Sequence, residues 1–130
     1  MDEHQEVWDA LRAHLKTIYE RDPHGYRQSV TEDLVIYEWY VTPNRQDGVG
    51  SHLFFIENTP VIPNGAAYHY ELLTPKIQRY GDVAVVCYTL MMMTALDGQR
   101  KVTTMNETRV LVKHDGRWRV SHVHKSPTAA

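Results

Sequence analysis

The sequence is poor in cysteine, in excess positive charge and in long apolar runs. It has one cysteine in 130 residues, Cys87, so an intramolecular disulfide and a cysteine-based zinc site are excluded. Lysine and arginine number 14 against 16 acidic residues, which argues against nucleic acid as a partner. No apolar run is long enough to span a membrane, and the N-terminus lacks the basic and apolar regions of a signal peptide. We therefore expect a cytoplasmic protein with no membrane contact.

The composition is that of one globular domain over residues 1–130, with 42% hydrophobic and 23% charged residues. Its first part is helical in pattern. Apolar residues at helical spacing predict a first helix over about residues 3–20, and Pro23 can open a second, short helix that ends near Ser29. The apolar residues that carry the first of these predictions are Val7, Leu11, Leu15 and Ile18.

The rest of the chain is mostly β in pattern. Thr42–Gly50 is predicted to be a polar loop, and Ser51 can cap a short helix. Helices followed by a run of strands favour an α+β fold with the helices on one face of an antiparallel sheet. Strands are predicted over residues 34–40, 67–79, 83–94, 101–114 and 117–125, with Pro75 at an edge or a bulge.

The strand over Val83–Met93 is apolar on both faces, because residues of both parities are apolar along it. Helices can cover only one side of the sheet. If the other side faced water, apolar and polar residues would alternate along the strand. We therefore expect a curved sheet whose concave face is roofed by the helices and holds a pocket. Its convex face is expected to pack on a second copy of the chain, as a homodimer or a higher homo-oligomer.

The C-terminal third carries three motifs at characteristic spacing. They read Glu-Thr-Arg-Val over Glu107–Val110, Asp-Gly-Arg-Trp over Asp115–Trp118 and His-Val-His-Lys-Ser over His122–Ser126. They closely resemble the association domain of calcium/calmodulin-dependent protein kinase II, which typically reads Glu-Thr-Arg-Val, Asp-Gly-Lys-Trp and His-Phe-His-Arg-Ser. The segments 51–58 and 81–84 resemble the same family more weakly.

This resemblance implies the cone-shaped α+β fold shared with nuclear transport factor 2, ketosteroid isomerase and the small polyketide cyclases. It also implies an oligomer, because the association domain of that kinase forms a large ring assembled from dimers. No kinase sequence accompanies the motifs in this chain, so the resemblance is to a free-standing, bacterial-type relative.

Three cationic or ionisable residues are candidates for a ligand pocket. Arg109 lies beside apolar residues, so its guanidinium needs an anion, supplied either by a bound ligand or by Glu107 on the same face. His52 matches a pocket histidine of the family; the alternative is a solvent-facing residue in the first turn of a short helix. Lys125 stands where the family has an arginine, which keeps the charge but loses the bidentate fork. Near Leu90 the family has a further pocket arginine that this chain lacks.

Other residues are candidates for chemistry. Glu38 lies among aromatic residues, where a carboxylate can have a raised pKa and act as a base; the alternative is a partner for a buried Arg or His. Tyr68 lines the mouth of the pocket or packs in the core. His122 and His124 share a face, in phase with Trp118 and Val120, and are expected to be structural rather than metal ligands.

The sequence therefore favours a non-catalytic domain for oligomerisation and for binding a small, anionic organic molecule, with Arg109, His52, Lys125 and Tyr68 in contact with it. No metal or cofactor is implied. The alternative is an isomerase or a cyclase that uses Glu38 as its base. The residues leave open the ligand, the pathway and the number of subunits above two.

Overall fold

The computed structural model describes residues 4–58 and 61–129. The helix predicted from periodicity is confirmed, although Glu3, its predicted first residue, lies outside the described residues. The short helix that begins at Pro23 is also confirmed. The elements in chain order are α1 (Gln5–Tyr19), α2 (Pro23–Ser29), β1 (Val30–Glu38), β2 (Thr42–Asp47), α3 (Val49–Asn58), β3 (Ala67–Tyr80), β4 (Val83–Leu96), β5 (Gln99–His114) and β6 (Arg117–Pro127).

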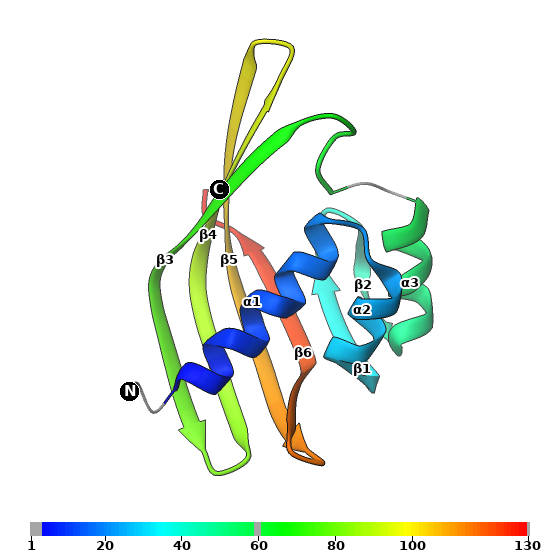
Figure 1. Cartoon of the computed structure of the whole chain (residues 1–130), viewed down its shortest axis with the longest axis vertical. Helices are drawn as coiled ribbons and strands as arrows, with labels where there is room; N and C mark the ends of the chain where they lie inside the picture. The colour runs from blue at the N-terminus through cyan, green and yellow to red at the C-terminus, as the bar shows by residue number, and fades with distance from the viewer. Residues whose placement is uncertain (1–3, 59–60, 130) are drawn as a thin grey trace.

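The described residues form a six-stranded, curved sheet in the order β2-β1-β6-β5-β4-β3, with α1 lying across one face (Figure 1). Strands β3 to β6 are the predicted antiparallel meander. Strand β1 joins the sheet parallel to β6, so that Glu38 lies opposite Lys125. The predicted α+β class, with helices on the concave face, is confirmed.

The polar stretch after β1 was expected to be a loop, and that expectation is wrong for Thr42–Asp47. These residues form β2, which pairs antiparallel with β1 at the edge of the sheet. A polar edge strand lacks the apolar alternation by which strands are recognised, because its side chains are largely exposed. The following helix begins at Val49, before the predicted capping residue Ser51.

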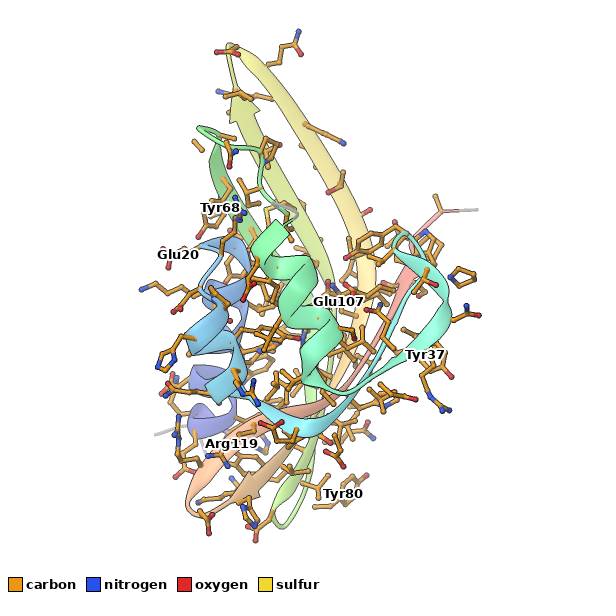
Figure 2. All side chains as sticks on the ribbon, turned by 90° about the vertical axis from the view of Figure 1, so that its right-hand side faces the viewer. Glu20, Tyr37, Tyr68, Tyr80, Glu107 and Arg119 are labelled. Atoms are coloured by element: carbon orange, nitrogen blue, oxygen red, sulfur yellow. The ribbon has the colours of Figure 1, made fainter. Side chains whose placement is uncertain are left out.

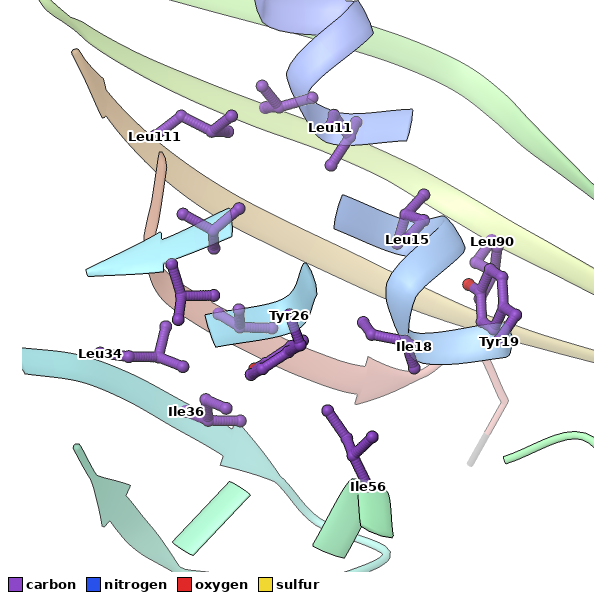
Figure 3. Packing of buried hydrophobic residues seen from close by; sticks show 14 of the residues in the cluster. Leu11, Leu15, Ile18, Tyr19, Tyr26, Leu34, Ile36, Ile56, Leu90 and Leu111 are labelled. Atoms are coloured by element: carbon purple, nitrogen blue, oxygen red, sulfur yellow. The ribbon is translucent and has the colours of Figure 1, made fainter. Parts of the chain in front are cut away.

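Helix α1 is fixed on the sheet by a stripe of side chains three and four residues apart (Figure 3). Leu11 and Leu15 are fully buried there, and each contributes roughly 1.5–3 kcal/mol by leaving water. Helix α2 begins with Pro23 at its first turn, and the side chain of Asp22 accepts a hydrogen bond of 3.0 Å from the backbone N–H of Gly25. These two helices form the roof of the concave face.

The two faces of β4 separate as predicted. One set of residues is buried beneath the helices, whereas the alternate residues are partly exposed on the convex side. Pro75 lies at the predicted irregularity, since the pairing of β3 with β4 shifts between Leu73 and Lys76. The buried set is Ala84, Val86, Tyr88, Leu90 and Met92; we call the convex set of Val83, Val85, Cys87, Met91, Met93 and Val110 the outer apolar face.

The predicted phase of the two C-terminal histidines is wrong. A shift in the pairing of β5 with β6 lies between Val110 and Leu111, where the partners change from His122 to Val120. The extra residue reverses the alternation. Val120 is therefore buried under the helices, while His122 is half-buried and His124 is exposed on the convex side, where its ring stacks on Tyr37 at 4.9 Å.

Candidate functional site

Glu38, at the end of β1, is the centre of a buried network of polar side chains. Its Oε2 accepts hydrogen bonds from the Lys125 ammonium at 2.8 Å and from the Tyr40 hydroxyl at 3.0 Å. Its Oε1 lies 3.2 Å from Nε2 of His52 and accepts a weaker hydrogen bond of 3.4 Å from Gln46. The residue is 2% exposed. Burial by itself would raise the pKa of Glu38, but the bond from His52 and the charge of Lys125 hold it well below its usual range.

A second buried group lies beside the first, on β4 and β5. The Arg109 guanidinium pairs with the carboxylate of Glu107 and donates a hydrogen bond of 2.6 Å to the Tyr88 hydroxyl, which in turn donates to Glu107 at 2.8 Å. Arg109 and Glu107 are each 2% exposed. This pair is the carboxylate alternative that the sequence offered for Arg109. Figure 2 shows the labelled Glu107 near the middle of the molecule.

The two groups form one unit, which we call the interior cluster: Glu38, His52, Lys125, Glu107 and Arg109. Glu107 lies opposite Lys125 in the register of β5 and β6. Burial by itself would lower the pKa of Lys125, but the negative charges of Glu107 and Glu38 raise it above its usual value. Lys125 is therefore a cation at neutral pH. Among these described side chains, the charges of Lys125 and Arg109 are balanced by those of the two carboxylates.

His14 of α1 also lies within this buried interior, where it is 1% exposed. Its Nδ1 is 2.8 Å from the Ser29 hydroxyl, which itself donates to the carbonyl of Tyr26, so Nδ1 carries the proton and Nε2 is an acceptor. Burial and the nearby charge of Arg109 lower the pKa of His14 well below its ordinary value. Nε2 of His14 and Nε of Arg109 are buried without a hydrogen-bond partner among the described residues. One acceptor and one donor of the interior are thus unpaired among the described residues.

A hollow of about 730 Å³ opens next to the interior cluster, and we call it the Tyr40 groove. Its floor includes the core-facing side chains of Leu90, Met92 and Met105. Tyr40 forms part of its wall, and the hydroxyl of the same residue also accepts a hydrogen bond of 3.0 Å from Lys125. The remaining lining residues are Trp39, Val41, Val61, Lys101, Thr103 and Thr104.

The structure brings together most of the residues singled out in the sequence. Arg109, His52, Lys125 and Glu38 all belong to the interior cluster, and none of the first three lines the Tyr40 groove directly. Tyr68 lies apart from them on β3, 37% exposed, with its ring 5.7 Å from that of Tyr19 (Figure 2). His52 is in the body of α3 and is 5% exposed, so it is not a solvent-facing residue of a first turn.

Three residues of the site were not predicted from the sequence, namely His14, Tyr40 and Tyr88. The position of His14 carried a signal, because it lies on the same helical stripe as Leu11 and Ile18 and is therefore directed toward the sheet. Tyr88 has the same parity as the buried residues of β4 and lies opposite Glu107 in the register. Tyr40 had no such signal, since it follows β1 and acquires its partners only through the fold.

Within residues 4–58 and 61–129 there is no group of three or more side chains arranged to hold a metal ion. No helix in the same residues is long and apolar enough to cross a bilayer.

Comparisons with known proteins agree on the family. The model of the calcium/calmodulin-dependent protein kinase II association domain matches residues 3–129. The kinase type II subunit delta of Oryctolagus cuniculus is 26% identical over 124 residues, which are 94% of this chain; the chain spans 23% of the length of that relative.

Solved structures agree on the fold. The calcium/calmodulin-dependent protein kinase II hub homology domain from Chlamydomonas reinhardtii has a TM-score of 0.87 at 22% identity, covering 98% of this chain and all of that one. A nuclear transport factor 2-like superfamily protein of Salmonella enterica has a TM-score of 0.77 at 23% identity, covering 97% of this chain and 91% of that one.

Proposed function

Because the chain belongs to the calcium/calmodulin-dependent protein kinase II association-domain family, we propose that it is a homo-oligomerising domain in which two copies join through their outer apolar faces. The observation that carries this proposal is the outer apolar face itself. Its residues come from neighbouring strands: Val85 lies opposite Val110, and Cys87 follows on the same side of β4. Val83, at its margin, is 38% exposed. No helix covers this side of the sheet in the described chain (Figure 1).

A two-fold contact suits such a surface, since each copy offers the same apolar strands to the other. A stable interface of this kind buries about 800 Å² on each partner. The flexible methionine side chains of β4 can adapt their shape to a second sheet. Association would thus remove from water a surface that the fold itself leaves exposed.

The test is a comparison of two matched substitutions. Val85→Glu places a carboxylate in the middle of the outer apolar face, whereas Val61→Glu places one at a residue that is 40% exposed elsewhere. Light scattering coupled to size exclusion should give a multiple of the 15.1 kDa chain mass for the wild type and for Val61→Glu, and a smaller assembly for Val85→Glu. A monomeric wild type, or a Val85→Glu variant with the wild-type mass, would contradict the proposal.

A second function, the binding of a small organic anion, is favoured by the contact between the Tyr40 groove and the interior cluster. We propose that the apolar part of the ligand lies over Leu90 and Met92 and that its anionic head displaces the Tyr40 hydroxyl from Lys125. Hollows of roughly 300–1,000 Å³ with apolar walls and few polar groups are typical of small-molecule sites. Arg109 and His52 then act on the ligand indirectly, through the carboxylates of Glu107 and Glu38 beside Lys125. Tyr68 also acts indirectly, through the contact of its ring with that of Tyr19.

The charge balance of the interior cluster predicts how an anion would bind. One more negative charge in a region where cations and carboxylates already cancel is costly unless a proton enters with it. His14, kept neutral by burial, is a buried group that can accept this proton. We therefore expect affinity to increase as the pH falls from 8 to 6.

Calorimetry with 3-phenylpropanoate and its neutral amide tests this second function. The acid should bind and its heat should depend on the ionisation enthalpy of the buffer, because a proton is taken up, whereas the amide should bind more weakly. Tyr40→Phe, which removes only the hydroxyl that competes for Lys125, should bind the acid more tightly. Equal affinity for acid and amide, or no saturable binding of either, would refute the ligand proposal and leave the oligomer proposal untouched.

The geometry favours catalysis less. A general base works best when its pKa is near the working pH. The contacts of Glu38 with Lys125 and His52 lower its pKa and hold its oxygens. An isomerase or cyclase mechanism with Glu38 as base would first have to break these bonds, so binding is the function that the arrangement supports better.

A further inference from the structure

A second hollow, away from the interior cluster, lies at the end of the sheet where β5 turns into β6, at the bottom of Figure 1. It has a volume of about 680 Å³, and we call it the basic groove. Two stretches of chain that are far apart in sequence form it, namely the passage from α2 into β1 and the β5–β6 turn. Its lining includes Arg27, Val30, Thr31, Val112, Arg117 and Arg119.

The charges of the groove are mostly positive and only partly matched. Arg27 pairs with Glu32 at 3.2 Å, and Lys113 with Glu6 at 3.4 Å. Arg117 and Arg119 have no carboxylate partner in the described part of the chain. Arg119 is nevertheless positioned, since its Nε donates a hydrogen bond of 3.4 Å to the carbonyl of Gln28; Figure 2 shows it at the lower end of the molecule.

The two arginines are spaced to act together. They are two residues apart on β6, opposite His114 and Val112 in the register, so they lie on one face of the sheet, roughly 6.5 Å apart along the strand. A tetrahedral anion between them can accept hydrogen bonds from both guanidinium groups. A carboxylate has two oxygens, whereas a phosphoryl group has three terminal oxygens and carries more charge, so it can offer separate oxygens to the two guanidinium groups.

A buried hydroxyl supplies an independent observation. Thr31 lines the groove, and its Oγ1 is buried without a hydrogen-bond partner among the described residues. Leaving a buried hydroxyl unpaired costs free energy, about 1–3 kcal/mol, so a rotation of the Thr31 side chain that brings its hydroxyl to an acceptor in the groove would be favoured. Val30 and Val112 add apolar side chains to the lining beside the arginines.

We propose that the basic groove binds a phosphate monoester, with its dianionic phosphoryl group between Arg117 and Arg119 and its organic part against Val30 and Val112. The phosphoryl oxygens are numerous enough to accept from both arginines and from Thr31. Because the second pKa of a phosphate monoester is about 6, the group carries close to two negative charges at pH 7.5, which the unmatched arginines neutralise. The site is separate from the interior cluster and takes a different ligand.

Phenyl phosphate is the probe that tests the proposal, with isothermal titration calorimetry and ³¹P NMR on the full chain at pH 7.5. The double variant Arg117→Gln with Arg119→Gln should weaken its binding roughly tenfold or more, since both charge-assisted contacts are lost. The matched control, Arg12→Gln with Arg100→Gln, removes the same charge from exposed positions outside the groove and should bind as the wild type does. Thr31→Val, which keeps the side-chain shape, should weaken binding by a smaller factor and provides a readout even if the arginine variant fails to fold.

Three results would overturn the proposal. The first is the absence of saturable binding of phenyl phosphate to the wild type. The second is an equal loss of affinity in the groove variant and in the matched control, which would show a general effect of net charge. The third is tighter binding of benzoate or of a glutamate-rich peptide than of phenyl phosphate, with dependence on Arg117 and Arg119, which would assign the groove to carboxylates.

Discussion

Replacing Glu38 by glutamine tests whether the interior cluster is held together by charge. The substitution keeps the size of the side chain but removes the anion that contacts Lys125 at 2.8 Å. Removing one partner of a buried ion pair costs about 3–5 kcal/mol, because a buried charge is left unmatched. The lower end applies here, since Glu107 also attracts Lys125. We therefore expect a loss of about 3 kcal/mol in the free energy of unfolding.

The expected shift in melting temperature follows from the chain length. With about 2.1 cal/mol/K of unfolding entropy per residue, 130 residues give about 270 cal/mol/K near the midpoint. A loss of 3 kcal/mol then lowers Tm by about 11 °C. Urea denaturation and calorimetry at several protein concentrations measure this, because an oligomer has a concentration-dependent Tm.

Two further variants test whether charge pairing stabilises the interior cluster. Glu32→Gln is the matched control, because it breaks an ion pair with Arg27 that is exposed on both sides and should change stability by less than about 1 kcal/mol. Lys125→Met should lower the free energy of unfolding less in the Glu38→Gln background than in the wild type. In that background the ammonium of Lys125 has already lost the Glu38 carboxylate, and the substitution removes an unmatched charge. If Glu38→Gln is as stable as Glu32→Gln, or if the two interior substitutions are additive, charge pairing does not hold the cluster.

The pH dependence of the Glu38→Gln effect has a definite sign. The pKa of Glu38 is lower in the folded chain than its ordinary value of 4.5. The stabilisation that depends on its ionisation is therefore present above pH 4.5 and is lost as the pH falls toward the folded-state pKa. The difference between wild type and variant should shrink in acid.

Tyr88→Phe should lower the free energy of unfolding by about 1.5–3 kcal/mol, because the hydroxyl bonds both Glu107 and Arg109, whereas Tyr80→Phe, at a residue 67% exposed, should change it little; urea denaturation compares the two. Acid should destabilise the fold in two stages. The pKa of His14 is lower in the folded chain than its ordinary value of 6.5, so protonation favours the unfolded state as the pH drops below 6.5. The pKa of Glu107 is lower than its ordinary value of 4.5, so the same happens for Glu107 below pH 4.5. His14→Met should flatten the first stage alone, and a stability profile between pH 7 and 5 that is unchanged in this variant would contradict the assignment.

Local patterns of residues were sufficient to predict several helices and strands. The helical spacing of Leu11, Leu15 and their neighbours defines α1, Pro23 marks the start of α2, and the alternation in β4 already separates a buried face from an outer one. These predictions succeeded because periodicity records which side of an element is buried, whatever covers that side. The C-terminal motifs likewise pointed to the family.

The pairing of the buried charges, in contrast, follows from contacts between distant segments of the chain. Glu38 and Lys125 are 87 positions apart in the chain and become neighbours because β1 pairs in parallel with β6. The one-residue irregularity in β6 sends His122 to the outer side, and the polar strand β2 exists only through its pairing with β1. Pairing and register depend on contacts between distant segments, and no local pattern encodes them.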